Sequence, residues 1–120
     1  MASIYTDVGE NQTADFFDGA GSAPADWKVG WGTGAGTAAK GDTTLFTESG
    51  ETRVSLTEAQ PSSNINSLTA TMTATAARTI TNAGVFDAAT AGNMVIKGDF
   101  TGQVLANGDK IDFTISLEWS

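Results

Sequence analysis

Two residue types that often carry chemistry are missing from this chain of 120 residues, which contains no cysteine and no histidine. Without cysteine, the fold cannot depend on a disulfide framework or on a thiolate metal site. Without histidine, the chain lacks the usual general base and the commonest ligand of transition metals. Most hydrolase, oxidoreductase and zinc-protein functions are therefore disfavoured. We expect no catalytic residues, no metal site and no cofactor.

Basic residues are also scarce: six lysines and arginines face fourteen acids, for a formal charge of −8. Such a chain is repelled by phosphate backbones and anionic lipids, so we expect neither nucleic acid nor membrane as a partner. No apolar run approaches the roughly 20 residues that cross a bilayer. The first seven residues lack the basic start and apolar run of a signal peptide, so we expect synthesis in the cytoplasm.

Alternation of apolar and polar residues is the main structural signal. It is clearest at 68–74 and 111–119, and a shorter example covers 27–31. Residues 78–87 and 94–100 favour two more strands joined by a small-residue turn. No window shows a sustained helical period. The pattern predicts an all-β fold, a single antiparallel β-sandwich or barrel-like domain.

The connections carry further predictions. Asn107-Gly108 is a strong hairpin dipeptide and predicts a hairpin between 102–105 and 110–119. Asp42 could cap one helical turn over 43–45. Residues 52–57 alternate weakly and could form another strand.

Glycines recur at every second position from Gly30 to Gly36. Such a run could cradle a phosphate, but a P-loop needs Gly directly before its Lys, and here Ala39 precedes Lys40. A flexible strand connection is the favoured interpretation. The scattered carboxylates, Glu48 and Glu51 among them, match no calcium-loop spacing and are interpreted as solvated or interface acids.

The chain divides into an N-terminal arm and loop at 1–26 and a β domain at 27–120. The arm is acidic, and residues 18–26 are a loop by composition. Its few large apolar residues are candidates for contact with a neighbouring subunit, and so are two tryptophans and two arginines of the β domain. Arg53 and Arg78 could pair with carboxylates across an interface, although pairs within one chain are the default. The full candidate set is Ile4, Tyr5, Phe16, Phe17, Trp27, Trp31, Arg53 and Arg78.

Three segments together resemble small virion proteins of tailed bacteriophages: Trp31 to Leu45 followed by Glu48 and Arg53, Arg78 to Phe100, and Asn107 to Phe113. The resemblance covers about residues 29–119. Relatives of this kind are structural parts of the particle, assigned to head decoration or to tail and fibre parts. The resemblance supplies no catalytic residue.

The resemblance and the small single domain favour a capsid decoration (cement) protein on the outer surface of the phage head. Its partners would be the major capsid protein and further copies of itself, with a trimer favoured because such sites have three-fold symmetry. The alternative is a structural or receptor-binding module of the tail or fibre. A glycan-binding module should expose Trp27, Trp31 or Trp119 beside carboxylates, whereas a polysaccharide-acting enzyme should show a cleft with opposed carboxyls.

Overall fold

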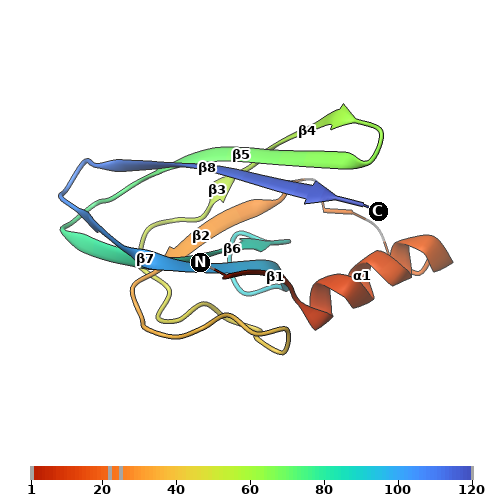
Figure 1. Ribbon diagram of the computed structural model, residues 1–120, viewed down its shortest axis with the longest axis horizontal. Helices are drawn as coiled ribbons and strands as arrows, with labels where there is room; N and C mark the ends of the chain where they lie inside the picture. The colour runs from red at the N-terminus through yellow and green to blue at the C-terminus, as the bar shows by residue number, and fades with distance from the viewer. Residues whose placement is uncertain (1, 22, 25, 120) are drawn as a thin grey trace.

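The computed structural model describes residues 2–21, 23–24 and 26–119, and it shows two antiparallel β-sheets packed face to face (Figure 1). Sheet A has the strand order β1-β7-β6-β2-β3 and sheet B the order β4-β5-β8. The predicted all-β sandwich is confirmed, and the sheets do not close into a barrel. The strands of sheet A are β1 (Ala2–Tyr5), β2 (Lys28–Gly32), β3 (Val54–Ser55), β6 (Arg78–Phe86) and β7 (Met94–Leu105). Those of sheet B are β4 (Thr57–Ser62), β5 (Ile65–Thr73) and β8 (Lys110–Glu118).

The alternating segments form the strands that their pattern predicts. β5 and β8 pair without a break from Ile65↔Glu118 to Thr73↔Lys110. Along β5, Leu68 and Met72 are buried while the intervening threonines are exposed. One face of sheet B therefore lies on the core and the other in water, as period-two alternation requires. The larger of two buried apolar clusters comprises Val29, Trp31, Leu56, Leu68, Met72, Ala74, Ile80, Val85, Val95, Ile96 and Leu105.

The two strands predicted at 78–87 and 94–100 are β6 and β7, which pair along most of their length. β2 pairs with the other side of β6, and this places Trp31 opposite Ala83 in the middle of sheet A. A segment of small and β-branched residues thus forms the centre of the larger sheet.

Residues Asp7–Asp18 form a helix, α1. The sequence analysis found no helical period in the chain and predicted no helix here, and this prediction was wrong. Thr6 begins the helix: its Oγ1 accepts the Gly9 N–H at 3.0 Å and donates to the Met94 carbonyl at 2.7 Å. Gly19, with φ of +73°, ends it in the left-handed conformation. Helical propensity in α1 is weak, so contact with β7 rather than local preference stabilises this helix.

The segment predicted as an arm is tied to sheet A. β1 pairs with β7 from Ala2↔Asp99 to Tyr5↔Ile96 and forms an edge of the sheet. The Thr6 N–H donates to the Val95 carbonyl at 2.9 Å, and the Asp7 N–H to the Lys40 carbonyl at 2.8 Å. Positions 22 and 25 of the loop predicted at 18–26 lie outside the described residues.

Asn107-Gly108 forms a turn, but the predicted hairpin is wrong. β7 belongs to sheet A and β8 to sheet B, so this turn carries the chain between the two layers. Gly108 has φ of +93°, and Asn107 does not share the positive φ that a type I′ turn needs. The Asp109 N–H closes the turn on the Ala106 carbonyl at 3.0 Å. A dipeptide such as Asn-Gly predicts that the chain reverses its direction. It does not predict which strand the following segment pairs with.

The glycine run is a tightly packed segment and not a flexible connection. A Cβ on Gly32 would lie 2.5 Å from the Phe46 carbonyl oxygen, and one on Gly36 would lie 2.6 Å from the Phe46 ring. These glycines let the loop at 33–49 fold back onto β2, where Gly32 bridges Glu48.

Two smaller expectations also change. Asp42 caps no helical turn; its carboxylate instead accepts the Ala39 N–H at 3.0 Å. The strand predicted at 52–57 is divided between β3 and β4, which lie in different sheets. Leu56 stands at the crossing, where it is buried and its N–H donates to the Trp27 carbonyl at 2.8 Å.

Candidate interaction surfaces and the polar contacts that shape them

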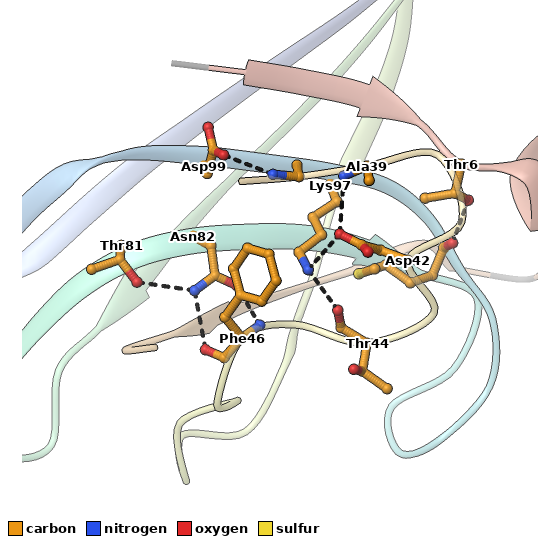
Figure 2. A network of polar contacts seen from close by, with 11 residues as sticks. Thr6, Ala39, Asp42, Thr44, Phe46, Thr81, Asn82, Lys97 and Asp99 are labelled. Carbon is orange, nitrogen blue, oxygen red and sulfur yellow. Dashed lines mark hydrogen bonds and ion pairs between the residues drawn. The ribbon is translucent and has the colours of Figure 1, made fainter. Parts of the chain in front are cut away.

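A buried lysine anchors the loop at 33–49 to sheet A (Figure 2). Lys97 of β7 is 0% exposed, and its Nζ donates to Asp42 Oδ2 at 3.0 Å and to the Thr44 carbonyl at 2.8 Å. The same Nζ lies 3.2 Å from the centroid of the Phe46 ring, a cation–π contact. Hydrogen bonds from the Ala39 N–H and from Lys97 hold the pKa of Asp42 below its usual value. These three contacts of the ammonium group all lie within the subunit, so we interpret them as structural.

Asn82 of β6 holds the same loop by imitating a strand partner. Its Oδ1 accepts the Phe46 N–H at 3.0 Å, and its Nδ2 donates to the Phe46 carbonyl at 3.1 Å. Asp99 adds a third tie, because its carboxylate accepts the Ala38 N–H at 2.7 Å. Figure 2 shows these contacts on one side of sheet A. The sequence analysis missed this network, although the charge of Lys97 directly after the apolar run 94–96 was a signal for it.

Glu51 is the centre of a second cluster of hydrogen bonds. Its carboxylate accepts from Trp31 Nε1 at 3.0 Å, from the Thr75 N–H at 3.0 Å and from Arg78 Nε at 2.8 Å, with Ser49 as a further donor. Burial opposes its ionisation, yet these hydrogen bonds outweigh burial and hold the pKa of Glu51 well below its usual range. Two candidate contact residues, Trp31 and Arg78, are thereby engaged within the subunit.

Trp31 is 1% exposed in the core, so it cannot serve as an aromatic platform or as a surface contact in this fold.

Arg53 is likewise engaged inside its own chain. It forms a bidentate pair with Glu48 at 2.8 Å and 2.8 Å, and its Nη1 donates to the Ala88 and Ala91 carbonyls. Its guanidinium carbon lies 3.4 Å from the centroid of the Phe86 ring. Both arginines therefore make the pairs within one chain that the sequence analysis took as the default.

The other candidate aromatic residues gather where α1 meets one end of the sandwich. Tyr5, Phe16 and Trp27 line a hollow of about 230 Å³ together with Trp119. This recess is the aromatic hollow. Tyr5 and Trp119 meet edge to face with ring centroids 6.1 Å apart. Trp119 is 45% exposed, and Glu58 and Asn66 lie in the same hollow. Phe17 stands outside it on α1, 89% exposed.

A second recess lies between the two sheets on the side where β1 and β8 are edge strands. This open cleft has a volume of about 390 Å³ and is mostly apolar. Ile4 and Tyr5 of β1 line one side, and Phe113, Ile115 and Leu117 of β8 line the other. These three inward side chains of β8 are only half-buried, because the sandwich is not filled at this side. Ile4 was a candidate contact residue, and the structure places it at this cleft.

The acids whose pKa is shifted lie outside both recesses. Asp87, like Asp42 and Glu51, has a lowered pKa: burial opposes its ionisation, but hydrogen bonds from the Asn93 N–H, from Gln12 and from the Asn93 amide outweigh it. Such carboxylates stay ionised and hold backbone groups. The two recesses offer apolar and aromatic walls, which suit packing against another surface.

The chain matches the family described as Gp80, podophage GP4 fiber I protein gp80, over residues 5–117. This chain belongs to that family. The match runs from the end of β1 through α1 to the last but one residue of β8. It includes most residues that line the two recesses, but neither Ile4 nor Trp119. The suspected likeness to phage virion structural proteins is confirmed. Among curated proteins, no match was found.

Two further features of this gp80 family member concern its helix and its carboxylates. Its helix is too short and too polar to span a membrane. Over residues 2–21, 23–24 and 26–119, no group of three or more Asp, Glu, His or Cys residues is placed to hold a metal ion.

Proposed function

We propose that this chain is a structural subunit of the phage fibre, and that it acts by packing against other virion subunits. The observation that carries this proposal is the match to a fibre-protein family over nearly the whole described domain. The open cleft and the aromatic hollow supply the apolar surface that such contacts need. Internal ion pairs fix the loops, so the domain is a rigid part whose recesses remain free for neighbours.

Immunogold labelling of intact particles with an antibody against this chain tests the proposal. We expect gold at the tail fibres. Absence of the chain from purified particles, measured by mass spectrometry, would refute any virion role. Gold spread evenly over the head would overturn the fibre assignment and support the head-decoration function.

The head-decoration function is the second candidate, with the major capsid protein as partner and a trimer as the favoured oligomer. Its supporting observation is the shape: principal extents of 44 × 28 × 26 Å describe a compact body, which suits a part that sits on a larger lattice. The family name favours the fibre, and we place the fibre first for that reason.

Glycan recognition is a further possibility for a fibre part. Trp119 lies half-exposed beside Glu58 and Asn66, an arrangement that suits sugar stacking and hydroxyl binding. Glycan-array binding that is lost in Trp119→Ala, and retained in the exposed control Phe17→Ala, would support a receptor-binding function. Equal binding by both variants would exclude the aromatic hollow as the site.

A further inference from the structure

Trp119 presents a fixed aromatic surface at the aromatic hollow, at the end of the sandwich where β8 finishes beside α1 (Figure 1). Its indole Nε1 donates to Asn66 Oδ1 at 2.8 Å, and its ring meets Tyr5 edge to face with centroids 6.1 Å apart. Trp119 is nevertheless 45% exposed. Because these contacts already orient the ring, a ligand that stacks on it immobilises little further. The C–H groups of a sugar ring suit such a surface, since the face of an aromatic ring carries partial negative charge.

Gln12 of α1 brings an unpaired acceptor to the wall of the hollow. Its Nε2 donates to Asp87 Oδ2 at 2.8 Å, so its amide oxygen is directed away from Asp87, which does not line the hollow. Among the described residues, Gln12 Oε1 is the single buried side-chain nitrogen or oxygen without a hydrogen-bond partner. Buried acceptors are nearly always paired, so this exception needs an explanation. A ligand in the hollow that carries a donor supplies one.

The charge of the hollow restricts the sugars that it can take. Glu58 of β4 lines it and is exposed, and its carboxylate has no partner among the described residues. Asn66 Nδ2 is a donor that likewise has no acceptor among them. The described residues that line the hollow include no lysine or arginine, and the whole chain has a formal charge of −8. An anionic sugar would be repelled here, so the hollow suits a neutral one.

We propose that the aromatic hollow binds one N-acetylated amino sugar, an N-acetylhexosamine. The pyranose ring stacks on Trp119, and the acetamido group enters the hollow, where its N–H donates to Gln12 Oε1. The acetamido methyl group packs on the apolar walls, and Glu58 and Asn66 bind hydroxyl groups of the ring. The inference rests on glycan recognition, the further possibility for a fibre part, and adds to it the class of sugar.

Other sugars fit the same walls less well. A plain hexose has a hydroxyl in place of the acetamido group and would leave the apolar walls without a contact. A free amino sugar would bring an ammonium group into an apolar recess, where loss of hydration opposes it. The volume of about 230 Å³ lies below the roughly 300–1,000 Å³ of sites for drug-sized ligands, so the hollow fits one sugar ring and not a longer segment.

Titration of the isotope-labelled full chain with N-acetylglucosamine and, separately, with N-acetylgalactosamine tests the proposal, with amide NMR shifts as the readout. We expect saturable binding of at least one of them, with a dissociation constant on the order of 1 mM because a single ring is a small ligand. Glucose should bind at least about fivefold more weakly, since it lacks the acetamido N–H and methyl groups. Glucuronic acid, which is anionic, should show no saturation.

Four variants connect the binding to named side chains. Trp119→Ala should weaken it at least about tenfold, and Trp119→Phe, which keeps an aromatic face, should recover most of the loss. Phe17→Ala changes an exposed side chain of α1 outside the hollow and is the matched control, which should change nothing. Gln12→Leu removes the acceptor, so the dissociation constants for the N-acetylated sugar and for glucose should come within about twofold of each other. A merely structural defect would weaken both sugars alike.

The possible failures are distinguishable. Equal affinity of the wild type for glucose and for the N-acetylated sugars would overturn the proposal and leave glycan recognition in place. Absence of saturable binding by any of these sugars, or equal binding by Trp119→Ala and Phe17→Ala, would overturn both. If circular dichroism shows that Gln12→Leu does not fold, the preference of the wild type and the Trp119 variants decide. Immunogold labelling tests the place in the particle separately, so the fibre assignment and the sugar site can fail independently.

Discussion

The buried pair of Lys97 and Asp42 allows an asymmetric stability prediction. Lys97 has a side chain 1% exposed, whereas the Asp42 side chain is 25% exposed and reaches water. Asp42→Asn keeps the shape of the carboxylate but leaves the Lys97 ammonium buried without its counter-charge. Removing one partner of a buried ion pair typically costs about 3–5 kcal/mol. The Thr44 carbonyl and the Phe46 ring still contact the ammonium, so we expect about 3 kcal/mol, the lower end of that range.

Lys97→Met removes the buried charge and leaves Asp42 able to regain water. We expect this variant to lose only about 1–2 kcal/mol, mostly from the unpaired Thr44 carbonyl. The double variant should resemble Lys97→Met, because a neutral pair has no uncompensated charge. It should therefore be more stable than Asp42→Asn alone, which is a strong departure from additivity.

Urea denaturation followed by tryptophan fluorescence measures all four proteins under the same conditions. The total stability of a domain of this size is about 5–15 kcal/mol, so the differences are well within range. The reasoning would be refuted if Asp42→Asn were as stable as Lys97→Met, or if the two losses simply added in the double variant.

Three further predictions follow from the contacts. Glu51 has a lowered pKa in the folded state, so the stability that it contributes is present above its ordinary pKa of 4.5 and is lost as pH falls through the folded pKa. Glu51→Gln should lower the free energy of unfolding by about 3 kcal/mol at pH 7. The same variant should reduce the loss of stability that the protein shows as pH falls. Gly9→Ala should destabilise the fold by about 1–3 kcal/mol despite the helix propensity of alanine, because the new Cβ would lie 2.5 Å from the Val95 carbonyl oxygen. The control Asn11→Ala, at an exposed position of the same helix, should stabilise the fold slightly. If both variants were stabilised, the docking of α1 on β7 would be contradicted. Deleting residues 1–21 should lower the melting temperature and raise aggregation, since it uncovers β7 as a long edge; a native-like melt of the truncated chain would show that β1 and α1 contribute little.

The strands were the most predictable part of this fold. Alternation in β5 and β8 reflects a sheet with one face on the core, and a short window of sequence contains that information. The same argument placed Trp31 correctly on an apolar face. It could not show that this face is covered, and Trp31 was therefore included among the surface candidates although it is 1% exposed.

The parts that the sequence did not predict depend on contacts between distant residues. α1 contains Gly9, Asn11 and Thr13, which favour helix poorly, and its docking on β7 joins segments nearly 90 residues apart. Lys97 meets Asp42 across 55 residues of chain. The glycines of the 30–36 run indicate flexibility in isolation, and only the approach of Phe46 shows that they are needed for close packing. A local sequence pattern does not indicate which distant residues will be in contact in the fold.

As a structural subunit of the phage fibre, this chain should lie in the tail fibres of the assembled particle. A cryo-electron microscopy map of the intact particle, at a resolution that separates β-sheets, tests it most directly. We expect two-layered densities within the tail fibres, each large enough to hold a fold with principal extents of 44 × 28 × 26 Å. A map in which such densities cover the head and are missing from the fibres would contradict it.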